Sequence, residues 1–177
     1  HAVNELTKLF LTDYYINIKK EPNIKFSDYY RDYHIENNSY VIPFGDGPFP
    51  IYDKNVGKSV IMNLLNHATN YVYITTPYLI VDHLLMNALE AAAKRGVEIK
   101  IITPGIPDKK LIYAVTRDSY RPLIKAGVQI FEYSKGFIHA KTVVVDDEIC
   151  VVGTINFDYR SLVHHFECGC FIVQNTV

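Results

Sequence analysis

Two side chains that can bind or attack a phosphate group stand two residues apart, next to a run of valines. His139 and Lys141 occur in the segment GFIHAKTVVVDDEICVVGTINF, which spans residues 136–157. The β-branched residues that follow them predict a strand over 138–145, and residues at i and i+2 of a strand project from the same face. We therefore expect the imidazole and the ammonium group to face one ligand together.

A second polar group follows the next apolar run, in the sequence VVGTIN. Thr154 and Asn156 are again two residues apart, so a strand-like backbone turns both toward one side. Gly153 precedes them, and a glycine there allows another backbone segment to come close. The side chains of Lys141, Thr154 and Asn156 can all donate hydrogen bonds to phosphate oxygens. We predict that these three residues bind phosphate.

One carboxylate, Glu167, stands in the apolar run FECGCFIV, where a buried charge needs a partner. His139 is the expected partner, because a carboxylate that accepts a hydrogen bond from an imidazole fixes the orientation of its ring. Asp146 stands at an odd spacing from both His139 and Lys141, which predicts that it faces the other side of the strand. The spacing therefore indicates a structural role for Asp146 at the strand end.

These residue types suit phosphodiester chemistry. A neutral imidazole is a sensible nucleophile, because the anionic ester repels anionic nucleophiles. Lys141 and Asn156 could stabilise the charge that gathers on the phosphoryl oxygens in the transition state. The sequence has no C-x-x-C pair, and the adjacent His164 and His165 would face opposite sides of a strand. We therefore expect a site that uses no metal and no cofactor.

The order His139-x-Lys141, Asp146 and then Gly153-Thr154-x-Asn156 resembles the HKD signature of the phospholipase D superfamily. The stretches YITTPYLIVD (73–82), RGVEIKIITPG (95–105) and NFDYRSL (156–162) resemble bacterial cardiolipin synthases in particular. Enzymes of that kind carry two HKD copies in one chain, behind membrane-spanning helices, whereas this sequence contains one copy. The chain therefore resembles the C-terminal half of such an enzyme.

The resemblance implies a role for each residue of the motif. The implied roles are catalytic for His139, Lys141 and Asp146, phosphate-binding for Lys141, Thr154 and Asn156, and histidine-orienting for Glu167. Two features depart from the family pattern. A threonine stands at 154 where serine is common across the superfamily, and HH at 164–165 replaces the more usual Leu-Asn.

The resemblance also implies an activity. A phosphatidyltransferase of this kind makes cardiolipin from two phosphatidylglycerol molecules and releases glycerol, through a phosphatidyl-histidine intermediate and without a metal. One histidine attacks phosphorus, and the histidine of a second HKD copy protonates the leaving glycerol. The expected partners are therefore phosphatidylglycerol or another membrane phospholipid, and a second half-site from a missing N-terminal half or another copy of this chain. The parent protein is expected at the cell membrane, on its cytoplasmic face, with this fragment itself soluble.

Two other functions remain open. The superfamily also contains phosphodiesterases that cut nucleic acids, and nucleic-acid binders of this size usually carry a strong basic excess. This chain of 177 residues has a formal net charge of -1, so no nucleic-acid partner is expected. The third possibility is a half-site module that serves in dimerisation or scaffolding and has no activity without its partner half.

The order of the predicted elements positions these residues. Strands and helices alternate three times between 39 and 133, at lengths that suit β-α-β crossovers and a parallel sheet covered by helices. Short links join the later strands, so antiparallel pairing is expected there. We predict an α/β fold, a phospholipase D-like α-β-α sandwich with a mixed, largely parallel sheet. The expected strands are 39–44, 71–76, 97–103, 128–133, 138–145, 149–154 and 166–173, and the expected helices are 2–18, 56–68, 84–95 and 109–125.

Two units are predicted along the chain. Residues 1–38 form an amphipathic helix and a linker that belong to the preceding half, and residues 39–177 form the phospholipase D-like domain, truncated at its C-terminus. The helix at 2–18 either rests on a membrane surface or packs against the domain. Tyr78, which follows Pro77, either lines a substrate cleft or packs at the rim of the core.

Overall fold

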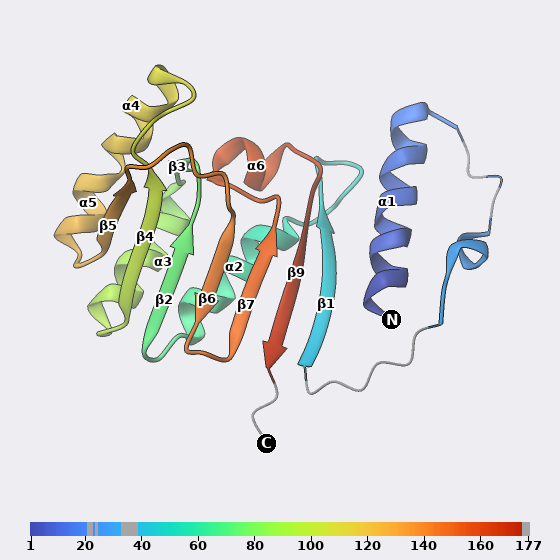
Figure 1. Ribbon diagram of the computed structural model, residues 1–177, viewed down its shortest axis with the longest axis horizontal. Coiled ribbons are helices and arrows are strands. Elements are labelled where there is room, and N and C mark those ends of the chain that lie inside the picture. Colours follow the sequence, from blue (N-terminus) through green and yellow to red (C-terminus); the bar gives the residue numbers. More distant parts are fainter. Residues whose placement is uncertain (21–22, 24, 33–38, 175–177) are drawn as a thin grey trace.

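A mixed seven-stranded sheet carries the fold in the computed structural model, which describes residues 1–20, 23, 25–32 and 39–174. The strand order is β1-β9-β7-β6-β2-β4-β5, and the short strands β3 and β8 form a separate pair (Figure 1). The strands of the large sheet are β1 (Ser39–Asp46), β2 (Tyr71–Thr75), β4 (Glu98–Pro104), β5 (Gln129–Tyr133), β6 (Thr142–Val145), β7 (Ile149–Gly153) and β9 (Glu167–Gln174). The pair consists of β3 (Leu79–Ile80) and β8 (Phe157–Asp158).

The direction of pairing changes along the large sheet. Strands β2, β4 and β5 pair in parallel, whereas β6, β7, β9 and β1 join through antiparallel pairs. The α/β class, the mixed sheet and the antiparallel pairing of the C-terminal strands are therefore confirmed. A largely parallel sheet is wrong for the described strands, because four of its six pairings are antiparallel. The difference arises at β1, which pairs with the last strand, β9, and does not join the parallel set.

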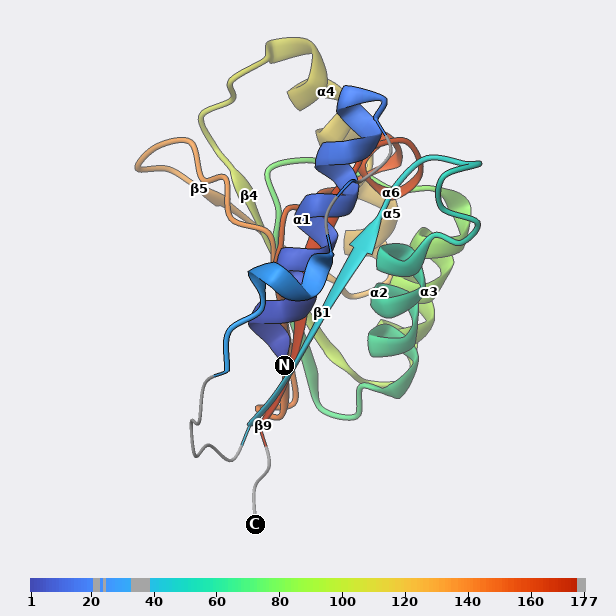
Figure 2. The same cartoon turned by 90° about the vertical axis from the view of Figure 1, so that its right-hand side faces the viewer.

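Helices lie on both sides of this sheet (Figure 2). The helices are α1 (Ala2–Ile18), α2 (Val56–His67), α3 (His83–Lys94), α4 (Lys110–Asp118), α5 (Tyr120–Lys125) and α6 (Tyr159–Val163), with a 3-10 turn η1 (Phe26–Tyr29). Helices α2 and α3 cover one face, with α5 beside α3, and α1 lies on the other side against β1.

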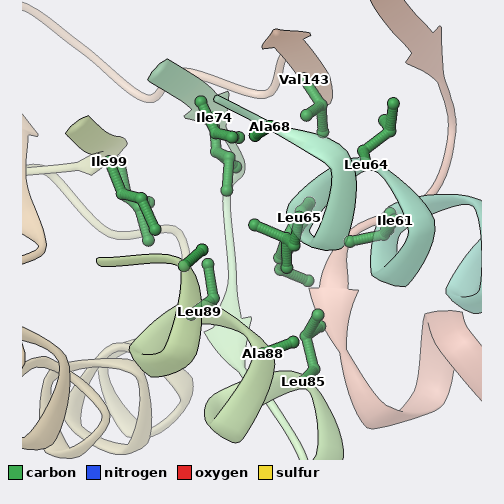
Figure 3. Packing of buried hydrophobic residues seen from close by; sticks show 14 of the residues in the cluster. Ile61, Leu64, Leu65, Ala68, Ile74, Leu85, Ala88, Leu89, Ile99 and Val143 are labelled. Carbon is green, nitrogen blue, oxygen red and sulfur yellow. The ribbon is translucent and has the colours of Figure 1, made fainter. Parts of the chain in front are cut away.

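The core lies between the sheet and helices α2 and α3 (Figure 3). Asp82 begins α3 by accepting a 3.0 Å hydrogen bond from the backbone N–H of Leu85, which satisfies a free helix donor. Apolar residues then recur at helical spacing, and the strands beneath bury every second residue. The buried side chains include Leu85, Ala88, Leu89 and Ala92 from α3, Ile61, Leu64 and Leu65 from α2, and Val72, Ile74, Ile99 and Ile101 from β2 and β4.

One predicted helix, 109–125, is broken in two. Helix α4 ends at Asp118 and α5 begins at Tyr120. Pro122 is the third residue of α5, and in a continuous helix its ring would clash with the carbonyl group of Asp118. The break therefore lets the chain restart a helix with the proline in its first turn, where a missing N–H is tolerated.

The predicted N-terminal helix is confirmed at its bounds, and it packs against the domain. Leu11 is buried, Leu9 lies close enough to Gly45 to touch a side chain there, and Tyr52 donates a 3.3 Å hydrogen bond to Asp13. Another stripe of α1 stays exposed, formed by Val3, Leu6, Phe10, Tyr14 and Ile18.

The predicted linker, 23–38, lies partly outside the described residues, and the division of the chain into two units stays a prediction. No helix within the described ranges combines the length and apolar character that crossing a bilayer requires.

Candidate active site

The candidate site lies at the edge of the sheet where β7 ends and β6 and β9 begin. His139 and Lys141 precede β6, Thr154 and Asn156 follow β7, and Glu167 is the first residue of β9. Strands β2, β4 and β5 end at this same edge, at the top of the sheet in Figure 1. Ligands of open α/β sheets bind beyond the carboxyl ends of the strands, so the predicted residues occupy a favourable place.

The segment with His139 and Lys141 is a loop, so the predicted strand 138–145 starts too early. Strand β6 begins at Thr142, although the carbonyl of Lys141 still accepts a 3.3 Å hydrogen bond from the Gly153 N–H. The Lys141 Nζ turns back and donates to the carbonyl oxygen of His139 at 2.7 Å. The His139 ring is exposed and lies beside Phe137, with ring centroids 5.5 Å apart. The imidazole is therefore accessible, and the lysine holds its backbone in place.

Gly153 has the role that the sequence predicts. A methyl group at this position would lie 2.3 Å from the carbonyl oxygen of Cys168 in β9, far closer than two such atoms can approach. The next residue, Thr154, donates its N–H to that same carbonyl at 2.9 Å. The glycine therefore lets the end of β7 lie directly against β9, which brings the loop after β7 up to Glu167.

Glu167 is buried, with 8% of its surface exposed, and its hydrogen-bond partners differ from the expected one. Its carboxylate accepts from the Thr154 hydroxyl and, at 2.5 Å, from the Ser161 hydroxyl. Nδ1 of His165 lies 3.6 Å from the same carboxylate. A hydrogen bond from the His139 ring does not occur among the contacts of the described residues. The orienting role of Glu167 therefore stays a prediction.

Thr154 was expected to bind phosphate through its hydroxyl group. That hydroxyl donates to Glu167 and accepts a 3.0 Å hydrogen bond from the Cys168 N–H. A phosphate oxygen would have to displace the carboxylate in order to receive the same proton. The phosphate-binding role of Thr154 stays a prediction, and the contacts support a role in holding Glu167.

Ser161 and Asp158 belong to the site, although the search for reactive residues missed them. Ser161 is buried, and its hydroxyl accepts from the Asn156 N–H at 2.8 Å while donating to Glu167. The Ser161 N–H donates to Asp158 at 2.9 Å, which caps the start of α6. An aspartate at the N-cap position of a helix is a recognised start signal, and it could have located Asp158.

Another buried carboxylate, Asp46, stands opposite Glu167 in the pairing of β1 with β9. Its oxygens accept hydrogen bonds from the N–H groups of Gly47 at 2.9 Å and Gly57 at 2.7 Å. Burial raises the pKa of Asp46, and the hydrogen bonds from Gly57 and Gly47 reduce that rise without reversing it. Asp46 thereby joins the end of β1 to the start of α2 beneath the site.

The ammonium group of Lys141 is partly buried near two carboxylates. Burial lowers the pKa of its ammonium group, while the nearby carboxylates of Glu167 and Asp158 act in the opposite direction, and the net pKa lies below its ordinary value. The ammonium group is therefore partly desolvated, and a desolvated cation interacts more strongly with phosphate oxygens than one in bulk water.

Asp146 lies at the other end of β6, away from His139. Its carboxylate accepts hydrogen bonds from the N–H groups of Thr69 at 2.8 Å, Asn70 at 3.0 Å and Tyr71 at 2.7 Å. A strand rises about 3.3 Å per residue, so Asp146 is roughly 16 Å along the chain from Lys141. The predicted structural role is confirmed, and this position does not fit the catalytic role that the resemblance implies for Asp146.

Replacing Asp146 with asparagine should destabilise the fold by about 2 kcal/mol at neutral pH, because several charge-assisted hydrogen bonds are weakened. Asparagine tolerates the left-handed backbone at this position, where φ is 52°, so strain is not added. Chemical denaturation measures the difference. Glu148→Gln removes a charge from the same turn and should have little effect.

The pH dependence of this difference tests the cause. Partial burial raises the pKa of Asp146, but the hydrogen bonds from Thr69, Tyr71 and Asn70 outweigh it and hold the pKa below its ordinary value of 3.8. A lowered pKa stabilises the fold above pH 3.8, and this stabilisation is lost as the pH falls through the lower folded-state value. The gap between wild type and Asp146→Asn should close in acid. A gap that persists unchanged at pH 2 would contradict the assignment.

Tyr78 lines a pocket of about 240 Å³ beside the site, which favours the cleft over packing at the core rim. Its hydroxyl donates a 2.7 Å hydrogen bond to Asp108, and burial together with this bond raises the pKa of Tyr78 to about 12.

Among the residues that the structure describes, no group of three or more His, Cys, Asp or Glu side chains is placed to hold a metal ion. A site that works without a metal stays a prediction.

Comparison with known proteins gives consistent matches. The family described as "Cardiolipin synthase, PLD-like domain" matches residues 61–177. A cardiolipin synthase of Clostridium perfringens is 34% identical over 182 residues, covering 99% of this chain and 37% of that enzyme. An uncharacterized protein of Streptococcus mutans is 52% identical over 137 residues, which are 77% of this chain and 29% of that protein. The chain thus spans about a third of the length of these relatives.

A solved structure shares the fold. Nuc from Salmonella typhimurium, a phospholipase D family member, superimposes with a TM-score of 0.64, covering 77% of this chain and 84% of that one. The two sequences are 18% identical, so this likeness concerns the fold alone.

Proposed function

The chain belongs to the phospholipase D superfamily, within the cardiolipin synthase PLD-like family, and from this we propose that it supplies one half of a phosphatidyltransferase active site. The complete enzyme would make cardiolipin and glycerol from two phosphatidylglycerol molecules at a membrane. The observation that carries the proposal is that His139, Lys141, Asn156 and the buried Glu167 all lie at the same edge of the sheet, before β6, after β7 and at the start of β9. The second half-site comes from another part of the parent protein or from a second copy of this chain.

In the proposed first step, an imidazole nitrogen of His139 attacks the phosphorus of one phosphatidylglycerol. The new nitrogen–phosphorus bond forms as the bond from phosphorus to the glycerol oxygen breaks, and the histidine of the other half-site gives that oxygen a proton. Lys141 and the Asn156 amide stabilise the charge on the remaining phosphoryl oxygens. The exposed position of His139 lets the imidazole reach a substrate without unfolding the loop.

In the second step, a hydroxyl group of another phosphatidylglycerol attacks the phosphorus, and the bond to His139 breaks. The partner histidine, now neutral, takes the proton from this hydroxyl, which restores both imidazoles to their starting states. Cardiolipin is the product. No bond requires an oxidant or a further co-reactant, because one phosphodiester is exchanged for another.

The proposal is tested by supplying vesicles of phosphatidylglycerol to the protein assembled with its second half-site. Mass spectrometry should detect cardiolipin and glycerol in equal amounts. Single-stranded DNA and a soluble aryl phosphodiester are tested as alternative substrates, each in a separate reaction. Cleavage of DNA without lipid transfer would replace the proposal with the nuclease alternative, for which the net charge of -1 offers no support.

Chelation should leave this activity unchanged. Charge on the phosphoryl group is handled by Lys141 and Asn156, so the chemistry has no step that calls for a divalent cation. Transfer rates are compared before and after treatment with EDTA and dialysis into metal-free buffer. Loss of activity that Mg²⁺ or Ca²⁺ restores would show that the charge is handled by a metal, and the mechanism would be wrong.

A further inference from the structure

One face of the large sheet is largely open. Helices α2 and α3 cover the opposite face, and in Figure 1 the strands lie in front of both helices. Helix α1 reaches the open side only at the β1 edge. Parallel strands such as β2, β4 and β5 normally have both faces covered by helices. The large side chains that point away from the core stay between 36% and 49% exposed. They include Tyr73, Ile102, Phe131 and Val152.

The centre of this open face is apolar and uncharged. Alternation along the strands turns five further side chains toward it, because their neighbours in the sequence point into the core. These are Val144 of β6, Cys150 and Val152 of β7, and Cys168 and Cys170 of β9. On the neighbouring β4, Lys100 and Glu98 form an ion pair with each other at 2.8 Å. An apolar partner can therefore cover the centre without burying an unpaired charge.

The apolar stripe of α1 is a surface of matching kind and length. It consists of Val3, Leu6, Phe10, Tyr14 and Ile18, which recur every three or four residues and so lie along one side of the helix. All five side chains are between 38% and 67% exposed. The 17 residues of α1 span roughly 25 Å. The seven residues of β4 span roughly 23 Å, so the helix can lie along the strands over its whole length.

The stripe does not cover the sheet of its own chain. Helix α1 is held at the β1 edge, where Leu11 is buried, Leu9 lies beside Gly45 and Asp13 accepts the 3.3 Å hydrogen bond from Tyr52. In this position the stripe and the open face are both exposed. A helix surface that lacks a sheet and a sheet face that lacks a helix therefore occur in the same chain.

We propose that two copies of this chain associate about a two-fold axis, with the stripe of each α1 packed on the open sheet face of the other copy. Because each chain carries both surfaces, a closed pair covers them all and leaves none for a third copy. Five side chains that are about half exposed offer on the order of 500 Å² per stripe. Two such contacts, counted on both sides, bury roughly 2,000 Å², which suffices for a stable dimer. This surface lies apart from the candidate site, and the proposal does not depend on the proposed function.

The mass of the purified chain in solution tests the proposal. Light scattering and analytical ultracentrifugation should find a dimer at micromolar concentration. Phe10→Asp on the stripe and Val152→Asp on the sheet face should each weaken the dimer at least about 100-fold, because each dimer would then bury two unpaired carboxylates. Leu84→Asp adds the same charge at a position on α3 that is 61% exposed and belongs to neither surface, so it should leave the dimer intact. A wild-type chain that remains monomeric would overturn the proposal.

A mixture of the two weakened variants identifies which surfaces meet. A pair with one copy of each keeps one intact contact, between the unaltered helix of Val152→Asp and the unaltered sheet of Phe10→Asp. Mixing should therefore restore part of the association, and circular dichroism establishes that each variant folds. Loss of the dimer in Phe10→Asp alone would mean that two helices pair, and loss in Val152→Asp alone would mean that two sheets pair. Either result would overturn the exchange of helices.

The cysteines supply a readout that needs no change in the sheet. All three cysteines of the chain, Cys150, Cys168 and Cys170, lie on the open face and are partly exposed. Iodoacetamide should alkylate them several times more slowly in the wild-type dimer than in Phe10→Asp, and equal rates would show that the face stays uncovered. Vesicles of phosphatidylglycerol test a lipid surface as the alternative occupant. A monomeric wild-type chain that sediments with vesicles, and loses this binding in Phe10→Asp, would assign the stripe to a membrane and overturn the proposal.

Discussion

Replacing His139 with alanine should lower the rate of cardiolipin formation by at least about 10⁴-fold, because the reaction loses the atom that bonds to phosphorus. Substrate binding should change little, since Lys141 and Asn156 remain. A phosphatidylglycerol labelled with ³²P at phosphorus supplies a second readout. Acid quenching during turnover should trap the label on the wild-type protein and leave the variant unlabelled.

His67 provides the matched control for this experiment. It is an exposed histidine at the end of α2, remote from the site, and His67→Ala should retain both transfer and labelling. Circular dichroism establishes that both variants fold. Substantial transfer by His139→Ala, or a label that persists in it, would move the nucleophile to another residue.

A monomer of this chain should form cardiolipin at least about 100-fold more slowly than the assembled two-site enzyme. The reactive nitrogen of His139 is consumed by its bond to phosphorus, so the same ring cannot protonate the leaving glycerol, and loss of a general acid typically costs 10²- to 10⁴-fold, roughly. His164 and His165 lack a lysine two positions later. Light scattering establishes the mass of each sample before its rate is measured.

A mixing experiment identifies the partner where two copies of this chain form the site. If both histidines of a two-fold dimer are needed, an equal mixture of wild type and His139→Ala should retain about one quarter of the activity, because only wild-type pairs react. Independent sites would retain about one half. Rapid transfer by a sample shown to be monomeric, abolished by His139→Ala, would disprove the half-site argument.

The features that sequence reasoning located are those that a local pattern encodes. Helical spacing placed α1, α2 and α3 within a residue or two of their bounds, and Gly153 was identified from its place at a strand end. The structural role of Asp146 was also predicted, but the reason differs: Lys141 and Asp146 flank β6 on either side, so the length of the strand, and not its alternation, separates Asp146 from the site.

The features that sequence reasoning missed depend on contacts between distant segments. A buried carboxylate requires a hydrogen-bond donor, but the sequence does not identify the residue that supplies it. Ser161 reaches Glu167 because a helix of five residues turns back toward β9, and five-residue helices leave little periodic signal. The position of β1 beside β9 was likewise hidden, because alternating strands and helices do not reveal which edge the first strand joins.

The position of β1 at the edge of the sheet determines how far the recombinant protein can be shortened at its N-terminus. The family match begins at residue 61, beyond the end of this strand. A shorter version cut there would leave β9 (Glu167–Gln174) without its outer neighbour, so every second residue of this strand would have unpaired backbone N–H and C=O groups, while the others still pair with β7. An unpaired edge strand can form backbone hydrogen bonds with the same strand of other molecules, which leads to insoluble aggregates. It would also remove Asp46 from beside Glu167. Recombinant versions that keep residues from 39 onward should therefore remain dispersed at concentrations where the shorter version precipitates.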